Sequence, residues 1–138
     1  MALEIAAESQ LVEGVDFVAL PTRDVVRAAR FYGETLGLRR SVLDERRHYA
    51  EFETGNLTLS VIDAEKMGLE HKAVRHEVAL HVADVEAARA TLEGRGVEFK
   101  GGTFDTGVCH MAFFDDLDGN ALMLHHRYAP RTGGALAE

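Results

Sequence analysis

The strongest constraint on how this chain can fold is an internal repeat. The segment FVALPTRDVVRA, which begins at Phe17, resembles EVALHVADVEAA, which begins at Glu77, sixty positions later. A second match joins HYAEFETGN, from His48, to HMAFFDDLDGN, from His110, with two extra residues before the shared Gly-Asn pair. Similarity in this order and spacing indicates a structural unit that occurs twice.

Each unit is predicted to have the element order βαβββ. A β-rich run opens it, at Val15–Leu20 and again at Glu77–Val82. Asp24 and Asp84 follow, and each is suited to cap a helix by accepting hydrogen bonds from its first backbone N–H groups. Three strands are expected after each helix, at about 39–43, 48–53 and 57–62, and at about 98–100, 108–114 and 121–126. The predicted fold class is therefore α+β, built from two tandem βαβββ modules.

We expect residues 1–138 to form a single domain, since this length is usual for one domain and 46% of the residues are hydrophobic. The two repeats cover about 15–62 and 76–128, and a polar linker, Asp63–Val74, joins them. Neither end of the chain shows a periodic pattern, so both termini, including the tail APRTGGALAE, are expected to be flexible.

Charge and composition argue against several functional classes. The net charge of −8 and the lack of a basic cluster argue against nucleic acid as a partner, while an acidic surface is compatible with a cationic ligand. No apolar run approaches the roughly 20 residues of a membrane span, and the start MALEIAAESQ does not resemble a signal peptide. A single cysteine, Cys109, fits a reducing compartment. We therefore expect a cytoplasmic protein that binds neither nucleic acid nor membrane.

The segments RAARFYGETLGL and FFDDLDGNALML, within a duplicated βαβββ unit, resemble the vicinal-oxygen-chelate superfamily. That group includes glyoxalase I, bleomycin-resistance proteins, fosfomycin-resistance enzymes and extradiol dioxygenases. The resemblance covers about Val15 to Tyr128. It implies two modules whose curved sheets form a cleft, usually in a homodimer that completes or flanks it. In metal-using members the cleft holds a divalent ion, bound by the first and last strands of both units.

The resemblance places the four metal-ligand positions on Phe17 and Leu59 in the first unit and on Glu77 and Met123 in the second, to within about one residue for Leu59. Phenylalanine and leucine have no donor atom, and a methionine thioether is a weak ligand for zinc, nickel, iron or manganese. One carboxylate cannot hold such an ion tightly. No cofactor is therefore predicted, and a divalent metal with displaced ligands is the alternative.

Strand alternation tests whether histidines could build such a displaced site. Glu77 and His81 share a face but lie about 13 Å apart at ~3.3 Å per residue, and His76 points to the opposite face. These three polar residues therefore do not form one cluster. A site made from Glu77, His125 and His110 stays open as the alternative.

Glu77 is the strongest candidate for a functional side chain, because a carboxylate on a strand that faces the cleft can act as a base or bind a cation. The alternative is a structural salt bridge with an arginine such as Arg127. His48 and His110 occupy equivalent positions in the repeats and would lie symmetrically across the cleft, where both could contact a ligand. The sequence does not decide which side of these two strands faces the cleft.

If the other phase faces inward, Tyr49 and Glu51 replace His48 as candidates. Phe17, Leu59 and Met123 would make the cleft floor apolar and suited to an organic ligand, with core packing as the alternative interpretation. Their neighbour on the last strand, His125, shares the phase of Met123.

The sequence thus favours metal-independent binding or sequestration of a small organic molecule in an apolar cleft, in a homodimer. The alternative is an enzyme, similar to a lyase or a dioxygenase, with displaced metal ligands or with Glu77 as a metal-free base. The sequence leaves open whether there is catalysis, and it names no ligand.

Overall fold

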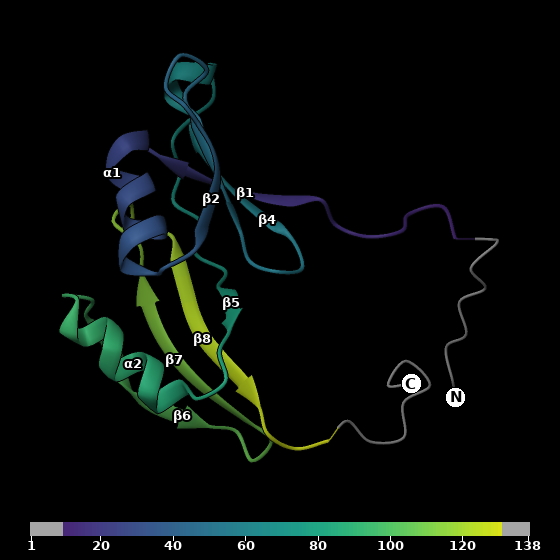
Figure 1. Ribbon diagram of the computed structural model, residues 1–138, viewed down its shortest axis with the longest axis vertical. Helices are drawn as coiled ribbons and strands as arrows, with labels where there is room; N and C mark the ends of the chain where they lie inside the picture. The colour runs from purple at the N-terminus through teal and green to yellow at the C-terminus, as the bar shows by residue number, and fades with distance from the viewer. Residues whose placement is uncertain (1–9, 131–138) are drawn as a thin grey trace.

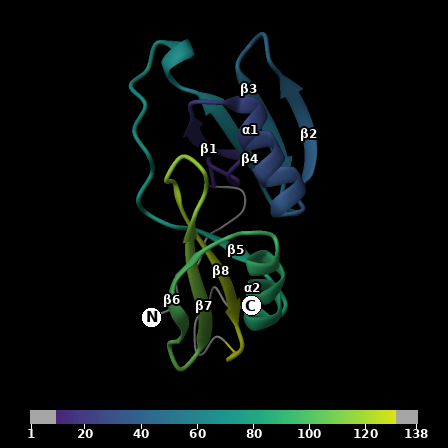
Figure 2. The same cartoon turned by 90° about the vertical axis from the view of Figure 1, so that its left-hand side faces the viewer.

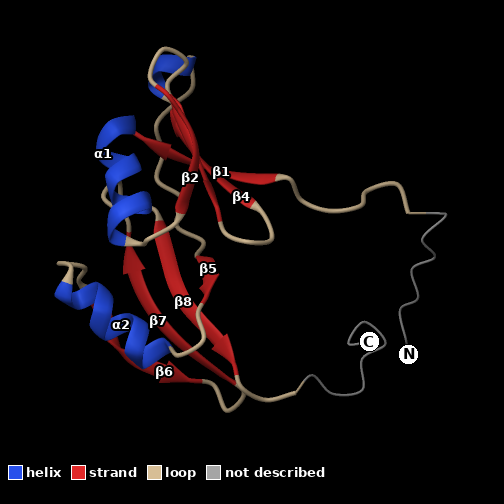
Figure 3. Cartoon of the chain, viewed as in Figure 1, coloured by secondary structure: helices blue, strands red, loops and turns tan. Residues whose placement is uncertain are grey.

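The computed structural model describes residues 10–130, which form two four-stranded sheets, each with a helix against it (Figures 1 and 3). The first module consists of β1 (Phe17–Thr22), α1 (Val25–Arg30), the π-helical turn η2 (Phe31–Thr35), β2 (Arg39–Asp44), β3 (Tyr49–Glu53) and β4 (Thr58–Asp63). A 3-10 helix, η3 (Glu65–Met67), lies in the linker. The second module consists of β5 (Val78–His81), α2 (Val85–Gly94), β6 (Phe99–Asp105), β7 (Cys109–Asp115) and β8 (Ala121–Arg127).

The two modules repeat the same sheet topology. The strand orders are β1-β4-β3-β2 and β5-β8-β7-β6, and in each sheet the first strand pairs parallel to the last while the other pairs are antiparallel. The modules lie one above the other along the long axis, and both helices lie on the same side (Figures 1 and 2). The predicted βαβββ order, twice, is confirmed.

Both helices begin where the sequence predicted. The side chain of Asp24 accepts a hydrogen bond from the backbone N–H of Arg27 at 3.0 Å, and that of Asp84 accepts one from Ala87 at 3.0 Å. Each carboxylate thereby satisfies one N–H group that has no partner inside the helix. Neither α1 nor α2 is long and apolar enough to cross a membrane, and the same holds for every other helix in residues 10–130.

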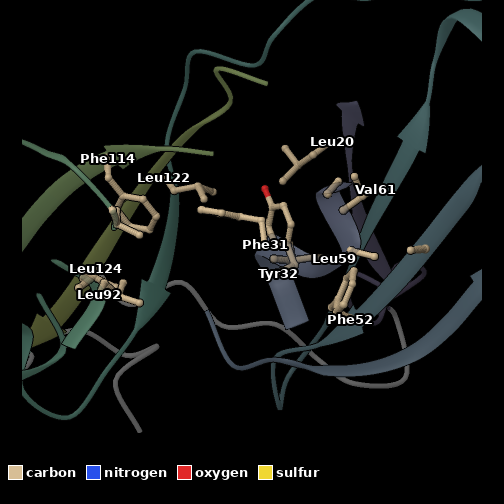
Figure 4. Packing of buried hydrophobic residues seen from close by; sticks show 14 of the residues in the cluster. Leu20, Phe31, Tyr32, Phe52, Leu59, Val61, Leu92, Phe114, Leu122 and Leu124 are labelled. Atoms are coloured by element: carbon tan, nitrogen blue, oxygen red, sulfur yellow. The ribbon is translucent and has the colours of Figure 1, made fainter. Parts of the chain in front are cut away.

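Strand alternation divides each sheet into two faces. Buried side chains on one phase pack toward the helices: Leu20, Ala50, Phe52, Leu59 and Val61 in the first module, and Ala112, Phe114, Leu122 and Leu124 in the second (Figure 4). The opposite phase of each sheet points away from its helix. This second phase forms the surfaces that we consider for function.

The strand β6 is longer than predicted. It continues to Asp105 instead of ending near Lys100, and its pairing with β7 shifts between Lys100 and Phe104. Gly101, at φ 67°, absorbs the irregularity, because glycine adopts this left-handed conformation without steric cost. The Gly-Gly pair is therefore part of a bulged edge strand and not the end of it.

A buried hydrogen-bond network joins the two modules, and it is built from the two segments that carry the family resemblance. Tyr32, after α1, donates its hydroxyl to the carboxylate of Asp116 at 2.6 Å. Asn120 donates to the same carboxylate at 2.8 Å and to the carbonyl of Pro21, in β1, at 2.9 Å. Burial, followed by the negative charge of Asp116, raises the pKa of Tyr32 well above its ordinary value.

The expected flexibility of both termini concerns residues 1–9 and 131–138, which lie outside the described residues.

Candidate functional site

We use the name first open face for the side of the first sheet that points away from α1. The pairing register and the buried opposite phase place these side chains on it: Phe17, Ala19, Tyr49, Glu51, Glu53, Thr58, Ser60 and Ile62. The residues on this surface are mixed, with two carboxylates beside hydroxyl and apolar groups. The sequence alone did not decide between this phase of β3 and the one that contains His48.

Glu53 is the most firmly held charged group on the first open face. Its carboxylate accepts hydrogen bonds from the hydroxyl groups of Ser41, at 2.5 Å, and Thr58, at 2.8 Å. These bonds, that of Ser41 first, lower the pKa of Glu53 below its ordinary value, because they favour the charged form. Since Phe17 pairs with Thr58 and Thr58 with Glu53, an anionic group lies two strands away from an exposed aromatic ring.

The second open face is the side of the second sheet that points away from α2. Its residues are Ala79, His81, Met111, Phe113, Met123, His125 and Arg127. Met123 pairs with Phe113, and the two form a half-buried apolar surface together with Met111. His125 lies between His81 and Met111 in the register. This face therefore offers apolar contact area with imidazole groups at one end.

Three of the predicted site residues are apolar, and the structure separates them. Phe17 lies on the first open face with 56% of its surface exposed, and Met123 lies half-buried on the second. Leu59 was expected on the cleft floor, but it lies on the covered phase of β4, where it also lines a pocket between the two modules. Leu59 pairs with Val18 and is fully buried toward α1, so its neighbours Thr58 and Ser60 occupy the open-face positions of β4.

Glu77 lies immediately before β5, and its side chain is exposed. By alternation it shares the phase of Ala79 and His81 on the second open face. Its side chain makes no hydrogen bond or ion pair with any other residue of 10–130. The suggested partner, Arg127, lies at the opposite end of the sheet, where it pairs with Cys109. Glu77 is therefore free to meet a ligand or a partner chain.

The expected symmetry of His48 and His110 across the cleft is wrong. His48 is the last residue of the turn before β3, with φ 69°, instead of the first residue of a strand. His110 shares its phase with Ala112, which points toward α2, and lies 3.5 Å from the carboxylate of Asp105. Tyr49 and Glu51 take the open-face positions, as the alternative interpretation of the sequence allowed.

The alternative metal site is not assembled. Glu77 and His125 belong to the second open face, whereas His110 points to the other side of that sheet. Within the described part of the chain, no three His, Cys, Asp or Glu side chains are close enough together to hold a metal ion. Of the four positions that the resemblance implies for metal ligands, only Glu77 carries a suitable donor, since Phe17 and Leu59 have none and Met123 offers a weak thioether, so this set does not fit a divalent ion.

Glu53 is the residue that sequence reasoning missed. It lies two positions after Glu51, so the same alternation that made Glu51 a candidate also selects Glu53. Its hydroxyl partners come from β2 and β4, and their proximity depends on strand pairing.

Comparisons with known proteins agree with this geometry. Residues 14–124 match the model of the family described as Glyoxalase/Bleomycin resistance protein/Dioxygenase superfamily. TnmS3, an antibiotic binding protein from Streptomyces sp. CB03234, superposes with a TM-score of 0.73 at 25% identity, over 86% of this chain and 98% of that chain. No curated protein matches the sequence.

Two further solved structures show the same fold. A glyoxalase/bleomycin resistance protein/dioxygenase from Nocardioides has a TM-score of 0.72 at 20% identity, over 92% of this chain and 93% of that chain. A lactoylglutathione lyase from Agrobacterium tumefaciens has a TM-score of 0.71 at 16% identity, over 83% and 93%. One of these structural neighbours is thus described as a binding protein and another as a lyase.

Proposed function

Because this chain belongs to the Glyoxalase/Bleomycin resistance protein/Dioxygenase superfamily, we propose that it binds a small organic molecule on its two open faces without a metal ion. The observation that carries this proposal is the apolar surface of Met111, Phe113 and Met123 on the second open face. An apolar surface with a few placed polar groups is the usual composition of a small-molecule site. The description of TnmS3 as an antibiotic binding protein supports the same class of function.

The charge of the site favours a ligand that carries a positive charge. Glu51 and Glu53 contribute two carboxylates to the first open face, and Glu77 adds one to the second. Hydrogen bonds from two hydroxyl groups keep Glu53 ionised. A planar organic cation would place its ring against the methionines and its charge near a carboxylate.

We propose that two copies of the chain complete the site. β1 is the edge strand of its sheet, and the side chains of Val15, two residues before it, and Phe17, its first residue, are 63% and 56% exposed. An apolar edge strand left in water favours pairing with another chain. In a homodimer that covers this edge, the first open face would become the wall of an enclosed cleft.

We further propose that the protein acts in the cytoplasm. The chain has one cysteine, Cys109, which is buried and free. A free thiol is stable in a reducing compartment, and this agrees with the expectation from composition.

The experiment is a thermal-shift screen with planar organic cations, repeated with a chelator, followed by calorimetric titration of each compound that binds. Binding should persist in the chelator. Met123→Lys should weaken it about tenfold or more, because it places a cation on the apolar surface. Met67→Lys is the matched control, since Met67 is exposed on η3, in the linker, and belongs to neither open face. Binding that disappears with the chelator would overturn the proposal.

Catalysis by Glu77 is the second candidate function, and it is supported by the exposed carboxylate of Glu77, which pairs with no other group in residues 10–130. An exposed carboxylate without a hydrogen-bond partner can accept a proton from a bound molecule. The two functions differ in the fate of the ligand. A binding protein returns it unchanged after long incubation, whereas turnover that Glu77→Gln abolishes would support an enzyme.

A further inference from the structure

A pocket of about 410 Å³ lies between the two modules, and most of its lining lies outside the two open faces, from which only Ala79 and His81 contribute. Leu36, Leu38 and Leu57 line it from the first module, and Leu80, Leu92 and Leu124 line it from the second. The volume falls within the range of small-molecule sites, roughly 300–1,000 Å³. The pocket is partly open to solvent, so its apolar surface is hydrated unless a ligand covers it.

The lining of this pocket carries a positive charge. Arg95, just after α2, lines the pocket and also lines a neighbouring hollow of about 610 Å³ between α1 and the start of β6. Arg27, Arg30 and Lys100 line the same hollow. These four cationic side chains give the hollow a local charge opposite in sign to the net charge of the chain, −8.

Most of these cations have no carboxylate partner. In residues 10–130, Arg27, Arg30 and Arg95 form no ion pair, while Lys100 binds Asp115 at 2.8 Å. Two carboxylates line the hollow. Asp115 also forms an ion pair with Arg75, at 3.1 Å, so only Glu98 is left to balance the charge of three arginines.

Arg95 is held in position by the other module. Its Nη1 donates a hydrogen bond to the backbone carbonyl of Thr35 at 2.8 Å. Because guanidinium has five N–H donors, this single bond leaves several to meet an anion in a fixed direction. A largely apolar space with one anchored guanidinium in its lining matches a molecule with an apolar body and an acidic head.

We call this pocket between the two modules the junction pocket. We propose that it is a second ligand site, which binds an amphipathic organic anion such as a carboxylate or a sulfonate. The apolar body lies between the leucines of the two modules, and the acidic group meets Arg95. This site takes a ligand of the opposite charge to the one that the open faces favour. A ligand there contacts both modules and therefore stabilises their relative position.

The test uses two fluorescent probes that differ in one group. The first is 8-anilinonaphthalene-1-sulfonate, and the second is N-phenyl-1-naphthylamine, which lacks the sulfonate. The native protein should bind the sulfonate probe saturably, with one probe per chain, and about tenfold more tightly than the uncharged probe. Arg95→Gln should remove this preference, and Arg46→Gln, an exposed arginine in the turn before β3, should retain it.

A filling substitution tests the pocket itself. Ala88 lies on the wall formed by α2, so Ala88→Phe should weaken both probes about tenfold. Ala90→Phe, on the exposed side of the same helix, is the matched control and should bind as the native protein does. Circular dichroism establishes that each variant is folded, and Arg95→Gln gives an independent result if Ala88→Phe does not fold.

The proposal fails if the native protein shows no saturable sulfonate binding, if Arg95→Gln leaves the probe preference unchanged, or if Arg46→Gln causes an equal loss. The result is independent of the proposed function, because Met123→Lys alters the second open face. That variant should leave the affinity for the sulfonate probe within about twofold of the native value. If it removes sulfonate binding, the probe occupies the open faces and the junction proposal fails.

Discussion

Tyr32 connects the two modules through one buried hydroxyl group, and its side chain is only 1% exposed. In Tyr32→Phe the carboxylate of Asp116 loses a donor that water cannot easily replace. The free energy of unfolding should therefore fall by about 1–3 kcal/mol. Urea denaturation near pH 8 measures this change. Tyr49→Phe, on the first open face, is the control and should change stability by less than about 0.5 kcal/mol.

The same residue predicts how stability depends on pH. Burial first, then Asp116, raises the pKa of Tyr32 above its ordinary value of 10.0, so the folded state binds the phenol proton more tightly than the unfolded state. The stabilisation from Tyr32 is therefore complete below pH 10.0 and is lost as pH rises toward the raised value. The stability difference between the native protein and Tyr32→Phe should shrink from about pH 8 to about pH 11. An unchanged difference would contradict this assignment.

His48 shows how a residue that suggests chemistry can have a backbone role. Its φ of 69° lies in the left-handed region, which costs a residue with a Cβ roughly 1–2 kcal/mol. His48→Gly should therefore leave the free energy of unfolding unchanged or raise it by up to about 1 kcal/mol. Tyr49→Gly, one residue later in β3, should lower it. If His48→Gly destabilises the protein as much as Tyr49→Gly does, the side chain of His48 has a structural role that the turn does not explain.

At the scale of elements, α2 depends on its cap. Asp84 satisfies the N–H group of Ala87, and its removal leaves that donor without a partner inside the helix. Asp84→Ala should lower the free energy of unfolding by about 1 kcal/mol, whereas Asp84→Asn should retain most of the stability because asparagine caps helices equally well. Thermal denaturation of the two variants compares them directly, and equal losses would show that charge, not capping, matters here.

Elements were predicted best where one local signal decided them. Both helix starts followed from an aspartate after a β-rich run, and the repeat supported β1 and β3 with second copies in β5 and β7. The prediction failed at β6, because Gly101 and Gly102 read as a turn. An edge strand tolerates a bulge there, since its outer side has no pairing to lose, and only the sheet order reveals that β6 is an edge.

For the whole molecule, the exposed start of β1 predicts self-association. Size-exclusion chromatography with light scattering should find a homodimer. Val15→Lys and Phe17→Lys should shift it toward the monomer, because each places a charge in the contact. Leu69→Lys is the control, since Leu69 is also exposed but lies in the linker. A native protein that is monomeric at every concentration would contradict the proposed dimer.

The sequence by itself determined the repeated βαβββ order, the two helix caps and the poor donor chemistry at the family's metal-ligand positions. These depend on residue type and on spacing along the chain, which are local or repeated properties. The tertiary structure alone decided which phase of each strand faces its helix. Alternation defines two faces but does not say which one is covered, so only the structure showed that Leu59 lies on the covered face and that His48 belongs to a turn. The tertiary structure alone also placed Arg95 beside the carbonyl of Thr35, sixty residues away in the sequence. The packing of one module against the other leaves no periodic signal in the chain from which this contact could be predicted.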